Sequence, residues 1–127
     1  MQAYLLVFFG AGLGGCLRHT VNILAARALG THFPWGTFLI NVSGSLVMGL
    51  IAGFLAFRAG EAWTQHVRLF TLTGILGGYT TFSAFSLDAA LLYERGDLGL
   101  CAAYVGGSVG LALAGVFGGL ALMRAIT

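Results

Sequence analysis

The sequence predicts an all-α membrane protein that crosses the bilayer with four transmembrane helices. Charged residues make up 8% of the 127 positions and hydrophobic residues 58%, whereas a typical soluble domain is about a quarter charged. The charges divide the chain into four apolar blocks, each close to the length of about 20 residues that a membrane-spanning helix needs. The blocks lack the polar alternation of barrel strands, so helices are the expected structure in lipid.

The first helix is expected over residues 3–27. Residues 1–17 contain no charge, whereas a cleaved signal peptide begins with basic residues, so this segment is expected to belong to the working protein. Arg18 lies within the expected helix and has three interpretations. Its side chain can extend to the membrane surface along an apolar stem, it can pair with a helix-end carbonyl, or it can make the mouth of a conduit electropositive.

The second helix is expected over residues 33–57, a block without charge in which Pro34 suits the first turn. Thr37, Asn41 and Ser45 recur at four-residue intervals, so they share one helix face. Asn41 is either an interhelical hydrogen-bonding residue or a donor whose amide faces a conduit and binds an anion.

The third helix is expected over residues 67–93, with a break near its middle. Gly77 and Gly78 are expected to open the helix, and Thr80 and Thr81 to cap a restarted one. Irregular backbone at membrane depth is tolerated where it is buried in protein or lines a cavity. Freed carbonyls at a break attract a cation, and freed N–H groups attract an anion. The alternative is a simple kink whose polar groups satisfy one another.

Two side-chain pairs follow the break at a spacing of three residues. Phe82 and Phe85 share one helix face, and Ser83 and Ser86 share another. Phenylalanines in a membrane helix usually pack or contact lipid, but their ring edges carry partial positive charge and can contact an anion. The pattern therefore allows both a packing face and an anion pathway without fixed charge.

The fourth helix, expected over residues 98–124, carries Tyr104 and Ser108 four residues apart. This signal is weak by itself, because serine in a membrane helix often bonds to its own backbone. Glycine pairs at the same spacing favour close packing of all four helices. These pairs are Gly10/Gly14, Gly49/Gly53, Gly74/Gly78, Gly106/Gly110 and Gly115/Gly119.

The short connections predict an up-and-down bundle with both termini on one side of the membrane. Arginines set the orientation of membrane proteins, yet here they are nearly balanced between the two sides. One side carries Arg58, Arg68 and Arg124, the other carries Arg27 and Arg95, and Arg18 is ambiguous. Two interpretations remain, a weakly determined single topology and a dual topology that pairs as an antiparallel homodimer. Because four helices shield little interior, we expect function to need an oligomer.

Composition also limits the classes of function. A net charge of +2 does not favour nucleic acid binding, and no set of histidine, carboxylate and nucleophile indicates an enzyme. Cys16 and Cys101 have no metal-ligand spacing. A small dual-topology multidrug or cation transporter needs a carboxylate deep in a span, but the first acidic residue is Glu61 and none is expected near a bilayer centre. A non-conducting assembly subunit would leave the polar positions at the break unexplained.

Residues 77–85, with the pattern Gly-Gly-x-Thr-Thr-Phe-Ser-x-Phe, are similar to the central motif of the CrcB/Fluc family of fluoride channels. Residues 14–18 and 36–44 resemble the family's motifs in the first two helices, and the resemblance spans essentially the whole chain. Many members carry Thr or Ser where this chain has an alanine after Ser83. The positions that depart from the family pattern are Tyr79, Ala84 and Ala112.

The resemblance implies an antiparallel dual-topology homodimer with two pores in the bacterial inner membrane, through which cytoplasmic fluoride leaves passively. It also implies a structural Na⁺ that is not transported and that the backbone carbonyls of Gly77 and Thr80 hold. Arg18 resembles an arginine near the vestibule. Neutral partners suit an ion that exchanges its water for hydrogen-bond donors and is then released. The expected fluoride pathway includes the two serines that follow the break. It consists of Asn41, Phe82, Phe85, Ser83, Ser86, Tyr104 and Ser108.

Overall fold

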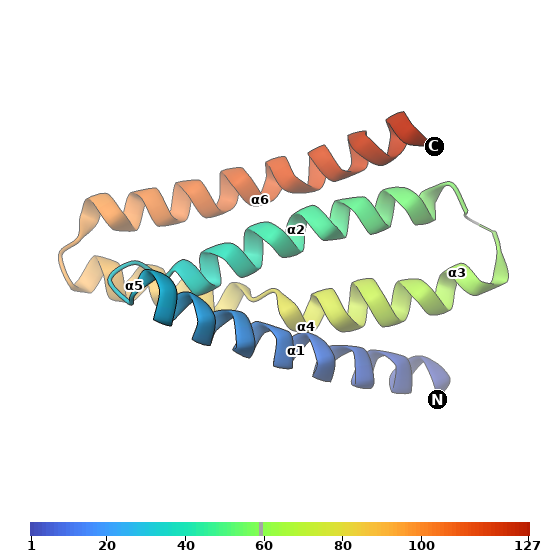
Figure 1. The fold of residues 1–127 in the computed structure, drawn as a ribbon, viewed down its shortest axis with the longest axis horizontal. Helices are drawn as coiled ribbons and strands as arrows, with labels where there is room; N and C mark the ends of the chain where they lie inside the picture. Colours follow the sequence, from blue (N-terminus) through green and yellow to red (C-terminus); the bar gives the residue numbers. More distant parts are fainter. Residues whose placement is uncertain (59) are drawn as a thin grey trace.

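The computed structural model describes residues 1–58 and 60–127, which form helices joined by short connections. Four helical stretches are long and apolar enough to cross a membrane: Gln2–Leu29, Trp35–Ala56, Ala62–Glu94 and Leu98–Ile126. Both termini lie at the same end of the bundle (Figure 1). The prediction of an all-α chain with four such helices, and of termini on one side, is therefore confirmed.

Three of the four stretches are single helices, whereas the third is divided. The single helices are α1 (Gln2–Leu29), α2 (Trp35–Ala56) and α6 (Leu98–Ile126). The third stretch consists of α3 (Ala62–Val67), the π-helical segment η1 (Arg68–Leu76), α4 (Gly77–Tyr79) and α5 (Phe82–Glu94). Between α4 and α5 the backbone is extended at Thr80 (φ −79°, ψ 157°) and Thr81 (φ −152°, ψ 118°).

The break lies beyond the glycines that the sequence predicted would open it. Gly77 and Gly78 remain helical, and a Cβ on Gly78 would lie 2.9 Å from Ala11 Cα, so this glycine allows α4 to pack closely on α1. The chain opens at Thr80 and Thr81, where β-branched side chains favour extended backbone and the Thr81 N–H donates to Asn41 Oδ1 on α2 instead of to its own helix. Thr81 caps α5, since an N–H of its first turn donates to Thr81 Oγ1 at 3.1 Å. The predicted threonine cap is confirmed, and the predicted opening at the glycine pair is wrong.

Glycines bring the helices together along two seams. α1 packs along η1 and α4, and α2 packs along α6. A Cβ on Gly10 would lie 2.9 Å from Gly74 Cα, and a Cβ on Gly119 would lie 2.7 Å from the Leu50 nitrogen. These contacts confirm the predicted packing role for four of the five glycine pairs. The exception is Gly106/Gly110, since a Cβ on either residue would meet nothing within 4 Å among the described residues. Most of the buried apolar side chains fall into two clusters, Leu55 with Leu72 and Leu76, and Phe85 with Leu92 and Tyr104.

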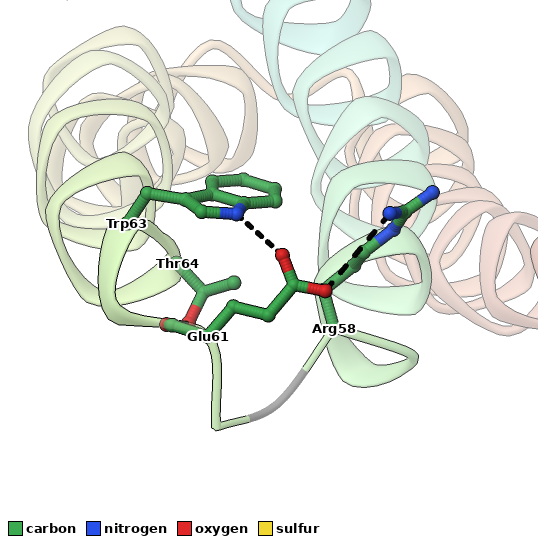
Figure 2. Close-up of polar contacts among 4 residues, drawn as sticks. All are labelled: Arg58, Glu61, Trp63 and Thr64. Carbon is green, nitrogen blue, oxygen red and sulfur yellow. Dashed lines mark hydrogen bonds and ion pairs between the residues drawn. The ribbon is translucent and has the colours of Figure 1, made fainter.

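The connection between α2 and α3 is organised around Glu61 (Figure 2). The Glu61 carboxylate accepts a hydrogen bond from Trp63 Nε1 at 2.5 Å and lies 4.0 Å from the Arg58 guanidinium. The backbone carbonyl of Glu61 accepts a further hydrogen bond, from Thr64 Oγ1 at 2.7 Å. These contacts hold Trp63 at one end of the bundle, a position typical of tryptophans at the membrane surface.

Candidate ion pathway

The break in the third stretch lies against Asn41 of α2. Asn41 Nδ2 donates to the Thr81 carbonyl oxygen at 2.9 Å, and the Thr81 N–H donates to Asn41 Oδ1 at 2.8 Å. The side-chain amide thus pairs with the backbone of one residue, much as a neighbouring strand would. The interhelical interpretation of Asn41 is confirmed. Because Nδ2 carries two hydrogens, one N–H remains for an anion, and that second role stays a prediction.

Two backbone carbonyls at the break lose the N–H donor that an α-helix would provide. In a continuous helix the Thr81 N–H would bond to the Gly77 carbonyl, and the Ala84 N–H to the Thr80 carbonyl. Asn41 Oδ1 accepts from the first donor, and Thr81 Oγ1 accepts from the second. Carbonyls of unwound membrane helices coordinate Na⁺ in other proteins. The two carbonyl oxygens of Gly77 and Thr80 are therefore suitable ligands for the Na⁺ that the resemblance implies.

A cavity of 230 Å³ opens beside the break. It brings together side chains from α2, the break, α5 and α6, and its walls are mostly apolar with a few polar groups. Among the described residues, those that line it carry no formal charge. They are Asn41, Ser45, Thr80, Thr81, Phe82, Phe85, Ser108, Val109 and Ala112.

Ser108 places a buried polar group at the wall of the cavity. Its side chain is 4% exposed, and its Oγ is the only buried side-chain nitrogen or oxygen among the described residues that lacks a hydrogen-bond partner. A buried hydroxyl without a partner costs about 1–3 kcal/mol. A small hydrogen-bonding guest in the cavity would remove this cost.

The N-terminal end of α5 adds a favourable electrostatic environment. Thr81 and Phe82 both line the cavity, so the first turn of α5 lies beside it. A helix N-terminus carries partial positive charge. Together with the Ser108 hydroxyl and the remaining Asn41 N–H, this end offers an anion only neutral partners. The site can therefore attract an anion without a fixed charge that would retain it.

A ladder of aromatic rings leads away from the cavity. Ring centroids lie 5.5 Å apart for Phe82 and Phe85, 5.2 Å for Phe85 and Tyr104, and 5.5 Å for Tyr104 and Phe33. The buried Tyr104 hydroxyl donates to Asp88 Oδ2 at 3.2 Å. The ladder therefore runs from the break to the connection between α1 and α2, where Asp88 lines a second recess.

The structure places five predicted site residues outside this cavity, namely Ser83, Ser86, Tyr104, Arg18 and Gly77. Ser83 Oγ lies 3.3 Å from Thr81 Oγ1, and Ser86 Oγ donates to the Phe82 carbonyl at 2.9 Å. Both serines are exposed on the surface of the chain. Arg18 is half-buried on α1, and it does not line the cavity either. The other five predicted residues, Asn41, Thr80, Phe82, Phe85 and Ser108, do line it.

Some site residues carry little signal in the sequence. Ser45, which the sequence places on the same helix face as Asn41 but not in the expected pathway, also lines the cavity. Val109 is apolar like most of α6, so nothing in the sequence distinguishes it. The contact between Tyr104 and Asp88 joins two helices, and no local pattern predicts it.

Comparison with known proteins gives consistent results over the whole chain. Residues 5–120 match the family described as CrcB-like protein, Camphor Resistance (CrcB). A Rhodopseudomonas palustris protein named fluoride-specific ion channel FluC is 71% identical over 126 residues, 99% of this chain and 100% of that protein. Fluoride-specific ion channel FluC 2 of Nitrobacter hamburgensis is 69% identical over 124 residues, 98% of each chain. A Beijerinckia indica protein with the FluC name is 54% identical over 127 residues, the full length of both.

Proposed function

The chain belongs to the CrcB family, and from this membership we propose that it is a fluoride-selective channel that lets cytoplasmic fluoride leave passively. Full-length relatives bear the name fluoride-specific ion channel. The observation that carries the proposal is the buried Ser108 hydroxyl, which has no partner among the described residues and lines a cavity without charged walls.

The cavity supplies what dehydrated fluoride needs. Fluoride is small and strongly hydrated, so a pathway must replace its water with hydrogen-bond donors and still release it. The Ser108 hydroxyl and the free N–H of Asn41 are such donors, and the edges of Phe82 and Phe85 add partial positive charge. Because all of these partners are neutral, binding stays weak enough for conduction.

The proposed channel is an antiparallel homodimer with two pores in the bacterial inner membrane. Phe82 is 77% exposed on the surface of the chain, beside the exposed hydroxyls of Ser83 and Ser86. Polar groups that face lipid are costly, so membrane proteins direct them towards protein or water. A second, inverted copy would cover this surface, and the near balance of arginines allows both orientations to insert.

A structural Na⁺ fits the break of such a dimer. When bound to the Gly77 and Thr80 carbonyls, it would supply a fixed positive charge that is not transported. The chain's own part is to keep both carbonyls out of the helical hydrogen-bond pattern, which Asn41 and Thr81 do. The two alternatives considered from the sequence, a drug transporter and a non-conducting subunit, receive no support from the relatives' names.

The proposal is tested with purified protein in liposomes loaded with potassium fluoride or potassium chloride. Valinomycin sets the potassium potential, and a protonophore removes any proton gradient. We expect fluoride efflux to start on addition of valinomycin. Chloride efflux should stay at the level of liposomes that contain no protein. Chloride efflux as fast as fluoride efflux, or fluoride efflux that requires a proton gradient, would overturn the proposal.

A further inference from the structure

Asn41 pairs with the backbone of the break through both polar atoms of its amide. We propose that Asn41 is a positioning residue for the cation site: its Oδ1 frees the Gly77 carbonyl and directs the Thr80 carbonyl. The inference rests on the proposed function, because it concerns the Na⁺ site of that channel. It gives Asn41 a role separate from any contact with fluoride.

The first effect concerns Gly77. Helical hydrogen bonding continues up to Thr80, whose N–H still donates to the Leu76 carbonyl at 3.0 Å. The next donor is the Thr81 N–H, which a regular helix would give to the Gly77 carbonyl. Asn41 Oδ1 accepts this N–H instead, at 2.8 Å. The acceptor on α2 therefore competes with the helix and leaves the Gly77 carbonyl without its helical donor.

The second effect concerns the peptide group between Thr80 and Thr81. This peptide is trans, as are all peptides in the described residues, and in a trans peptide the C=O and N–H point in opposite directions. Because the Thr81 N–H points to Asn41, the Thr80 carbonyl points away from α2. One hydrogen bond thus sets the direction of one proposed ligand and frees the other.

An amide suits this position better than other polar side chains. The Thr81 carbonyl, on the next peptide, needs a donor, and Asn41 Nδ2 supplies it at 2.9 Å. A hydroxyl or an apolar side chain cannot make both contacts at this reach. The residue before the break is also tied to α2, since Ser43 Oγ lies 3.0 Å from the Tyr79 hydroxyl. Two residues on one turn of α2 therefore contact the break, and Asn41 is the one that pairs with its backbone.

The test compares Asn41→Ala with Ser108→Ala, which removes a pathway hydroxyl that makes no hydrogen bond to the break. The first readout is the Na⁺-induced rise in melting temperature of the purified protein in sodium-free buffer, because an ion that binds only the folded state stabilises it. The second is the Na⁺ concentration that gives half-maximal fluoride efflux. In Asn41→Ala we expect this concentration to rise by at least about tenfold and the thermal shift to disappear. Ser108→Ala should lower maximal efflux and keep the wild-type response to Na⁺ in both readouts.

The outcomes separate the inference from the proposed function. If the wild-type protein shows no fluoride efflux, the proposed function is overturned. If its efflux and melting temperature do not depend on Na⁺, the proposed cation site is overturned. An Asn41→Ala protein with reduced efflux but a wild-type Na⁺ response would overturn the positioning role alone. If Asn41→Ala does not yield folded protein, Asn41→Ser, whose hydroxyl is one bond too short to make both contacts, replaces it under the same criteria.

Discussion

Phe82 and Phe85 lie on one side of α5 with ring centroids 5.5 Å apart, but Phe82 is 77% exposed whereas Phe85 is 9% exposed. Both rings line the cavity beside the break. Phe85 therefore forms a wall inside the chain, and Phe82 projects to where the proposed second copy would lie. The two rings are expected to act on the same ion and to differ in their effect on stability.

Replacing either ring with isoleucine tests the pathway. Isoleucine keeps an apolar side chain but has no ring edge, so we expect fluoride efflux to fall about tenfold in Phe85→Ile and in Phe82→Ile. Phe85→Ile should lower the melting temperature more than Phe82→Ile, because only Phe85 is buried within the chain itself. Phe117→Ile is the matched control, since Phe117 is 69% exposed on α6 and does not line the cavity. Undiminished efflux in both test variants would contradict the ring-edge pathway.

Ser108→Ala is expected to separate stability from transport. The Ser108 hydroxyl is buried without a partner among the described residues, so its removal should stabilise the protein by about 1 kcal/mol in fluoride-free buffer. Fluoride efflux should fall, because a donor to the ion is lost. Thermal unfolding and efflux are measured on the same preparation.

The control for this separation is Ser43→Ala. The Ser43 hydroxyl has partners, the Tyr79 hydroxyl at 3.0 Å and the Ile40 carbonyl at 3.3 Å, so its removal should destabilise the protein by about 1 kcal/mol. If Ser108→Ala also destabilises the protein, the Ser108 hydroxyl is satisfied within the fold and does not indicate a guest.

Gly14→Ala is expected to disrupt the seam between α1 and the third stretch. An added Cβ would lie 2.8 Å from the Tyr79 nitrogen and would contact the Ile75 carbonyl oxygen. Because both atoms belong to backbone, the helices must separate, at a cost of about 1–3 kcal/mol. Gly12→Ala is a control on the same helix, since a Cβ on Gly12 meets nothing within 4 Å in the described residues. Equal melting temperatures for the two variants would show that the seam tolerates an added methyl group.

The four helices were predictable because hydropathy is a property of single residues summed over a block. The break was predictable only in part. Thr81 carries a local signal as a cap, but the exact opening depends on Asn41, which is 40 positions away in the sequence. The prediction that the helix opens at Gly78 was wrong because a missing Cβ has two effects. It loosens a helix, but it also allows close packing, here against Ala11. Propensity is local, whereas the choice between these two uses of glycine is made by tertiary contacts.

The cavity shows the same limit. Asn41 and Ser108 stand out because polar residues are rare in apolar helices, so the sequence reveals them one by one. Their convergence with Phe85 on one cavity is a result of how α2, α5 and α6 pack. No periodicity within one helix contains that information, and this is why Val109 could not be identified in advance.

The last prediction concerns orientation in the membrane. Because the arginines are nearly balanced between the two ends, a Thr127→Cys variant in a background without the native cysteines should be labelled from both sides of the membrane to about equal extents. Removing the positive charges from one end should fix a single orientation and abolish fluoride efflux, since the proposed dimer needs both orientations.

Two variants with opposite charge changes test this requirement: Arg27→Gln with Arg95→Gln, and Arg58→Gln with Arg68→Gln and Arg124→Gln. Co-expression of these opposite variants should restore efflux, because each supplies the orientation that the other lacks. Efflux from either variant alone, once labelling shows a single orientation, would refute the antiparallel dimer and leave the fluoride pathway itself intact.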